Sequence, residues 1–157
     1  MDREVKLWAK TLLLAYPYLE KVAFLADRQL MSKAAGSWRA YGDAFDVCKG
    51  VIDTIYIKDS YINAKLVTLA AWRMLNAKFA KVIELRYFKK MKIAAVAERM
   101  RMSSRGVEKM LPAAEQAFAE ALLKCGKNEE KLEELFGASP FLLGVKADAE
   151  LRGAFSE

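Results

Sequence analysis

The sequence predicts an all-α fold in which a helical N-terminal part precedes a helix-turn-helix. Apolar residues recur at alternating steps of three and four along almost the whole chain, which is the spacing of one helix face. The 157 residues are 54% hydrophobic, enough to bury a sizeable core, and they fit one domain with at most a small appendage. We divide the chain into a helical region (1–75), a helix-turn-helix region (76–125), and a short acidic helix with a tail (126–157).

The first helical segment carries one long apolar stripe. Its members are Val5, Trp8, Leu12, Ala15, Leu19, Val22 and Ala26. We expect one helix or two helices joined at Tyr16-Pro17, because Pro is tolerated in the first turn of a helix. The stripe indicates either pairing with a second copy, which would make a homodimer, or packing on its own domain.

The middle of the chain is predicted to form several shorter helices. The stretch KAAGSWRAYGDAF is interpreted as a connection, with a helix beginning near Asp43, a good cap residue. This helix is expected to break at IKDSYIN, where Asp59 or Ser60 caps the next one. Asn76 is expected to cap a further helix. Four residues are expected to share one face of the helix after Asp43: Phe45, Cys48, Ile52 and Ile55.

The helices of the C-terminal part are predicted from the residues that can end a helix. A helix is expected to run to about Cys125, where Gly126 can end it. A short acidic helix then spans 128–136, and residues 137–157 receive no prediction.

Composition narrows the classes of function. The net charge of +6 allows an anionic partner. The charge is also local, since residues 81–112 hold nine Lys or Arg against three Glu. There is no His, no glycine-rich phosphate loop and no carboxylate cluster with metal spacing, so we expect no enzyme, cofactor or metal site. A carboxylate or lysine enzyme remains a formal alternative. Two isolated cysteines and the lack of an apolar run long enough to span a bilayer indicate a cytoplasmic protein without membrane contact.

The segment RYFKKMKIAAVAERMRMSSRGVEKM is interpreted as two helices joined by a turn. The first helix spans about 92–100, and the second begins after Ser103, which can cap it. Ala97 supplies the small residue that closely crossing helices need. The core of the motif is predicted to consist of Val96, Ala97, Met102 and Val107.

This layout predicts a DNA-reading face on the second helix. Ser104, Arg105, Glu108 and Lys109 are expected to point outward near its N-terminus, the part that enters the major groove in helix-turn-helix proteins. Arg105 and Lys109 are candidate donors to guanine or phosphate, and Glu108 is a candidate acceptor from cytosine. Lys92 is expected near the DNA backbone, and Arg101 in the turn completes the predicted DNA-binding set.

The same segment resembles region 4 of bacterial housekeeping-type sigma factors, without a gap over residues 85–103. The resemblance places base-reading positions on Ser104, Arg105, Glu108 and Lys109 and a phosphate contact on Lys92. A looser resemblance over residues 1–120 is to ArpU- and RinA-like phage-associated regulators of Gram-positive bacteria.

Three residues depart from the sigma pattern. Arg101 stands where the turn often has Gly, which costs about 1 kcal/mol if φ is positive. Gly106 is unhelpful by about 0.5–1 kcal/mol if it is helical. Pro112 predicts a kink in the second helix, or a break with a new helix beginning there.

The resulting functional hypothesis is a phage or mobile-element transcription regulator that binds double-stranded DNA. One alternative is a protein-interaction module that contacts RNA polymerase. Another is a phage DNA-packaging recognition subunit, which would form rings.

Overall fold

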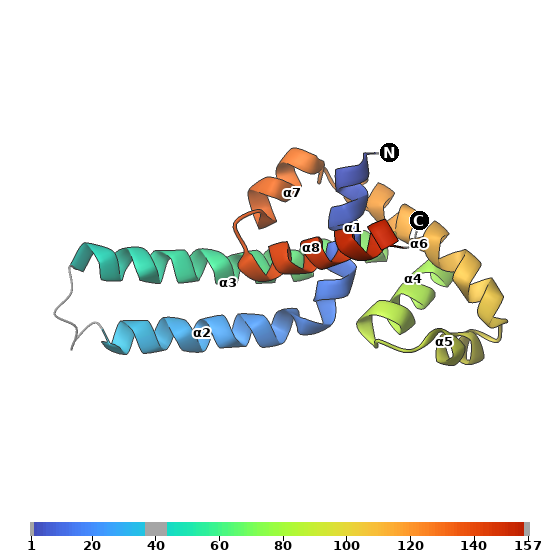
Figure 1. Cartoon of the computed structure of the whole chain (residues 1–157), viewed down its shortest axis with the longest axis horizontal. Helices are drawn as coiled ribbons and strands as arrows, with labels where there is room; N and C mark the ends of the chain where they lie inside the picture. The colour runs from blue at the N-terminus through green and yellow to red at the C-terminus, as the bar shows by residue number, and fades with distance from the viewer. Residues whose placement is uncertain (1, 37–43, 156–157) are drawn as a thin grey trace.

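The computed structural model describes residues 2–36 and 44–155, and these are helical without a strand, which confirms the all-α class. The elements are α1 (Arg3–Ala15), η1 (Tyr16–Tyr18), α2 (Leu19–Gly36), α3 (Ala44–Arg73), α4 (Ala77–Ile83), η2 (Glu84–Phe88), α5 (Ile93–Met100), α6 (Ser104–Lys124), α7 (Glu129–Phe136) and α8 (Pro140–Phe155). The α2–α3 hairpin projects from one end of the molecule, and α5 with the start of α6 forms the other end (Figure 1).

The N-terminal stripe forms the centre of the core. Val5, Trp8, Leu12, Ala15 and Leu19 are all at most 1% exposed. The chain turns between α1 and α2 through the short 3₁₀ segment η1, which contains Pro17, so the two-helix reading of this region is confirmed. Because the stripe is covered by the chain's own helices, it is not available to a second copy. The inference of a homodimer from this stripe is therefore wrong.

Helix α3 is longer than the sequence indicated. The predicted break at IKDSYIN does not occur, because the chain there contains no Pro or Gly and the Ser60 hydroxyl donates to the Ile57 carbonyl inside the helix at 2.7 Å. Of the four residues expected to share one face, Ile52 and Ile55 are exposed, at 55% and 41%. The predicted cap Asp43 and connection residues 37–43 lie outside the described residues, as do the side chains of 33–48. The stretch 33–36, predicted as connection, belongs to α2.

The turn into the helix-turn-helix region has the predicted cap. Asn76 accepts a hydrogen bond from the Phe79 N–H at 2.9 Å and begins α4. After α4 the chain widens into η2, a single π-helical turn, closed by the Lys89 N–H donating to the Glu84 carbonyl at 2.9 Å. The splitting of residues 61–88 at Asn76 is therefore confirmed, whereas the π-helical turn was not foreseen.

Helix α6 continues through Pro112. The predicted break at this residue is wrong, because α6 is one helix that packs against α1, α3, α4 and α5 along its length. Pro112 is exposed, so the Glu108 carbonyl that loses its helical donor lies at the surface, where water can bind it. Packing of the buried side of α6 thus offsets the loss of the hydrogen bond to the Glu108 carbonyl.

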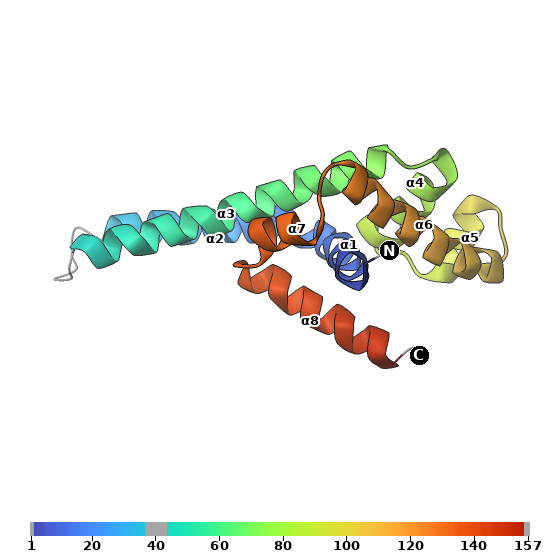
Figure 2. The ribbon, with the colours of Figure 1, turned by 90° about the horizontal axis from the view of Figure 1, so that it is seen from above.

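The C-terminal part closes over α1 (Figure 2). Asn128 caps α7 by accepting from the Lys131 N–H at 2.9 Å, as its position before the acidic helix predicts, and α6 ends just before Gly126. Helix α8 was not predicted. A cluster joins it to α1 and α7: the Lys146 ammonium lies 4.5 Å from the Trp8 ring and 2.9 Å from Glu133, and the Trp8 N–H donates to Glu133.

Candidate nucleic-acid interface

The turn between α5 and α6 is a Schellman motif centred on Arg101. The Met102 N–H donates to the Ala97 carbonyl at 3.0 Å and the Arg101 N–H to the Glu98 carbonyl at 3.3 Å. This pattern requires a left-handed residue after the helix, and Arg101 has φ 54° and ψ 47°. Arg101 therefore meets the condition under which its departure from glycine has a cost.

The same motif ends α6 with a glycine. The Lys127 N–H donates to the Leu122 carbonyl and the Gly126 N–H to the Leu123 carbonyl, both at 2.9 Å, and Gly126 has φ 78°. One chain thus uses Gly at one such position and Arg at the other. A left-handed conformation costs a non-glycine residue about 1–2 kcal/mol. The backbone therefore gives no reason for the arginine.

The start of α6 is set by Ser103. Its hydroxyl accepts from the Gly106 N–H at 3.0 Å, which confirms the predicted cap. A Cβ on Gly106 would lie 3.2 Å from both the Met102 methyl and the Ser103 hydroxyl oxygen. The glycine that sequence reasoning regarded as unfavourable thus leaves room for the cap and for Met102.

The predicted core residues lie between α5 and α6. Val96 and Val107 are fully buried and Ala97 is 4% exposed, while Met102 is half-buried against the core. The two helices are in direct contact. All four residues are thus part of the buried core or packed against it.

The predicted DNA-binding residues all have exposed side chains: Lys92, Arg101, Ser104, Arg105, Glu108 and Lys109. Within the described residues, none of the four cations among them makes an ion pair, whereas the nearby Lys81 and Lys89 both lie within 4.0 Å of Glu84. Sequence reasoning missed Arg99, which is also exposed and without a carboxylate partner. Its place in the last turn of α5, two residues before Arg101, was the available signal.

Lys92 occupies a distinct position at the start of α5. It is the extended residue that precedes the helix, and no side chain caps the first N–H groups of α5. Unsatisfied N–H groups at a helix start attract anions. The start of α5 thus combines the Lys92 ammonium with unsatisfied backbone N–H groups, and both favour an anion.

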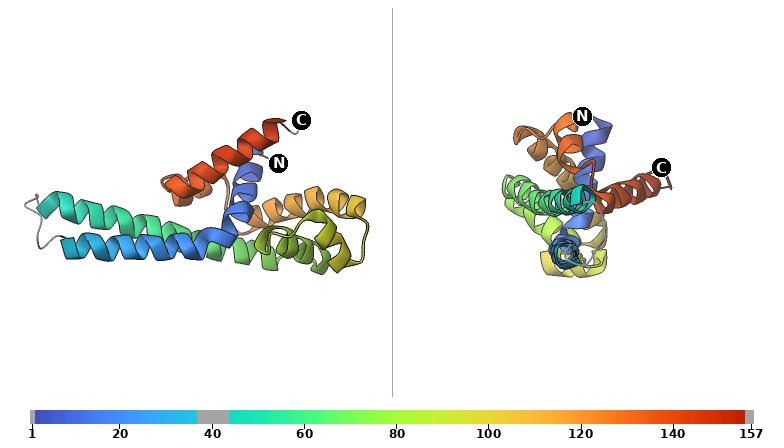
Figure 3. Two further views of the ribbon diagram at one scale, coloured as in Figure 1. Left: turned by 60° about the horizontal axis from the view of Figure 1, so that its bottom comes forward. Right: turned by 90° about the vertical axis from the view of Figure 1, so that its left-hand side faces the viewer.

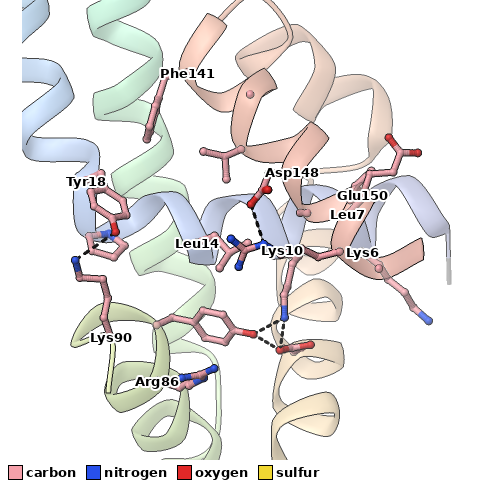
Figure 4. A pocket seen from close by; sticks show the side chains of 18 of the residues that line it. Lys6, Leu7, Lys10, Leu14, Tyr18, Arg86, Lys90, Phe141, Asp148 and Glu150 are labelled. Atoms are coloured by element: carbon pink, nitrogen blue, oxygen red, sulfur yellow. Dashed lines mark hydrogen bonds and ion pairs between the residues drawn. The ribbon is translucent and has the colours of Figure 1, made fainter. Parts of the chain in front are cut away.

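A groove on the other side of η2 is lined by α1, η1, α6 and α8 (Figure 4). Its polar groups satisfy one another: Lys10 donates to Tyr87 at 2.6 Å and to Glu115 at 2.9 Å, and the Tyr87 hydroxyl donates to Glu115. Burial, and then the Glu115 charge, raise the pKa of Tyr87, so the phenol stays protonated. This cluster ties η2 to α1 and α6, which indicates a structural role.

No protein-family model, curated protein or solved structure matches this chain. None of the helices in the described ranges is long and apolar enough to cross a membrane. Among the same residues, no three Cys, Asp or Glu side chains are grouped to hold a metal ion.

Proposed function

We propose that this protein is a DNA-binding transcription regulator that reads the major groove with the first turns of α6. This is the function that the sigma-like resemblance implies, of the phage or mobile-element type. The observation that carries the proposal is a group of exposed cations on α5, on the turn and on α6 that make no ion pair with any described residue: Lys92, Arg99, Arg101, Arg105 and Lys109.

The contrast between Arg101 and Gly126 supports the proposal. Two equivalent backbone positions carry different residues, and the arginine is the less stable choice. Its side chain makes no ion pair within the described chain. A cation kept at a backbone position that disfavours it is expected where the charge meets a partner such as a phosphate group.

The roles of the remaining residues follow from their places. Arg105 and Lys109 are one turn apart on α6, so both can reach the same groove, Arg105 with the bidentate geometry that suits guanine. Lys92 and the N–H groups at the start of α5 would bind a backbone phosphate. Glu108 would accept from cytosine N4 and repel phosphate at wrong registers.

Binding to DNA that flanks the protein's own gene tests the proposal. Fluorescence anisotropy would compare the wild type with Arg105→Ala/Lys109→Ala across several salt concentrations. The control is Lys49→Ala/Lys124→Ala, which removes the same charge from exposed positions at the far ends of α3 and α6. If Lys92, Arg99 and Arg101 neutralise three phosphates, the slope of log K against log salt is about −2.7, and it should stay near that value in Arg105→Ala/Lys109→Ala because these two residues contact bases.

The two variants should differ in specificity as well. Arg105→Ala/Lys109→Ala is expected to weaken specific binding roughly 10- to 100-fold more than non-specific binding, whereas the control is not. Equal affinity of both variants for the best site would refute the proposed face. Retention of RNA polymerase by the protein without DNA, combined with that result, would favour the alternative of a polymerase-contacting module.

A further inference from the structure

The α2–α3 hairpin has its large apolar side chains on the outside. The buried side chains of its two helices include small and polar ones, such as Thr54, Ser60 and Ala26. In contrast, eight large apolar side chains of the hairpin are 41–75% exposed: Phe24, Leu25, Met31, Ile52, Ile55, Tyr56, Ile62 and Leu66. Exposed apolar residues that occur singly are ordinary, but exposed apolar residues that line up along neighbouring helices mark an interaction site.

Helix α3 carries two apolar lines, each with alternating steps of three and four residues. The first line faces α2 and the body of the protein and consists of Thr54, Ile57, Tyr61, Ala64, Thr68 and Ala71, all buried or half-buried. The second line consists of Ile52, Ile55, Asp59, Ile62 and Leu66, all exposed. Each such line is the seam that one neighbouring helix fills in coiled-coil packing. The described chain fills only the first.

Helix α2 contributes a matching line on the same side of the hairpin. Lys21, Phe24, Arg28 and Met31 are spaced by three and four residues. Two ion pairs locate the side: Lys58 lies 2.7 Å from Asp27, and Lys65 is paired with Glu20.

On each helix the outward line contains the residue that directly follows an ion-paired one, such as Lys21 after Glu20 and Asp59 after Lys58. Successive residues are about 100° apart around the helix axis, so each line lies about one such step beyond the ion pairs. The two lines therefore border the same flank. No other helix covers the outer part of the hairpin in any view (Figure 3).

We propose that this outer face of α2 and α3 binds the same face of a second copy of the chain, forming a symmetric homodimer. The extent of the face fits a helix–helix interface, because its exposed apolar residues run from Phe24 to Met31 on α2 and from Ile52 to Leu66 on α3.

The charges fit as well. Asp59 is the only carboxylate in the α3 line, and Arg28 and Lys21 lie in the α2 line. None of the three makes an ion pair within the described chain. Packing of α3 on α2 of the other copy brings opposite charges together twice in a two-fold arrangement.

The proposed dimer surface is therefore the hairpin and not the N-terminal stripe. The hairpin projects away from α5 and the start of α6, so pairing through it leaves both copies of that end uncovered (Figure 1). The inference concerns self-association alone and stands whether or not the protein binds DNA.

Sedimentation equilibrium of the full chain without DNA tests it. The wild type is expected at twice the 17.7 kDa mass of the chain at micromolar concentration. Ile55→Lys/Ile62→Lys and Phe24→Lys/Met31→Lys should each raise the dissociation constant at least 100-fold. Helix content, measured by circular dichroism, should not change, because all four residues are already exposed.

The control replaces apolar residues of similar exposure elsewhere. Leu123→Lys/Leu151→Lys lies on α6 and α8, at 39% and 60% exposure, and should remain dimeric. A wild type that stays monomeric up to about 100 μM overturns the proposal, since an interface of this size should persist there. A dimer that survives both hairpin variants, or that the control dissolves, also overturns it.

Discussion

Replacement of Arg101 by glycine is expected to stabilise the protein while weakening its binding to DNA. Arg101 has φ 54° and ψ 47°, a conformation that costs a residue with a β-carbon about 1–2 kcal/mol. Glycine removes that cost but adds freedom to the unfolded chain, worth about 0.4–1 kcal/mol in the opposite direction. Since the exposed side chain makes no ion pair within the described residues, nothing else is lost. The net gain is about 0.5–1 kcal/mol.

Urea unfolding measures this gain, and Arg101→Ala is the matched control. Alanine removes the same charge but keeps the β-carbon, so its stability should stay near that of the wild type. With a typical slope of about 2 kcal/mol per molar urea, glycine should raise the midpoint by about 0.3–0.5 M. DNA affinity should fall equally in both variants, because both lack the cation. A glycine variant no more stable than the alanine variant would show that the left-handed turn is not strained.

Three further predictions test the fold. Pro112→Ala should stabilise the chain by about 1–3 kcal/mol in urea unfolding, because it restores the hydrogen bond to the Glu108 carbonyl; unchanged stability would mean that α6 has relaxed around the proline. Ser103→Ala should cost about 1 kcal/mol in the same assay, through the lost cap of α6, and a neutral result would contradict the capping bond. The hydrogen bond from Lys146 holds the pKa of Glu133 below its ordinary 4.5, so this carboxylate stabilises the fold above that pH and the contribution is lost as pH falls through the lowered value. Glu133→Gln should therefore be less stable than wild type at pH 7 and equal to it at pH 2, and a difference that persists in acid would exclude the ion pair as its source.

The elements that sequence reasoning located correctly are those with local signals. Asn76, Ser103 and Asn128 each accept a hydrogen bond from the backbone N–H three residues later, a bond that depends on a few consecutive residues. For Arg101 the sigma-like resemblance raised a positive φ only as a condition, and the structure has that conformation. Such features are encoded within one turn of the chain and need no distant partner.

The errors concern residues whose state depends on packing. Asp59 or Ser60 was expected to cap a new helix after a break, but the Ser60 hydroxyl is satisfied inside α3, which α2 supports along its length. The exposure of Ile52 and Ile55 was not predicted, because an apolar line in a sequence does not say whether the chain itself supplies the facing helix. Helix α8 was not predicted, although Ser139 and Pro140 have the pattern of a cap followed by proline at the first helical position.

The sequence by itself determined the all-α class, the helix starts at Asn76, Ser103 and Asn128, the basic segment between residues 81 and 112 and the residues exposed on α6, because period, capping and charge are local properties. Only the tertiary structure decided which apolar line is core and which is surface. The stripe from Val5 to Leu19 is covered by the chain's own helices, and the equally regular line from Ile52 to Leu66 is not. Burial depends on what packs opposite a helix face, and that partner is set by the path of the whole chain.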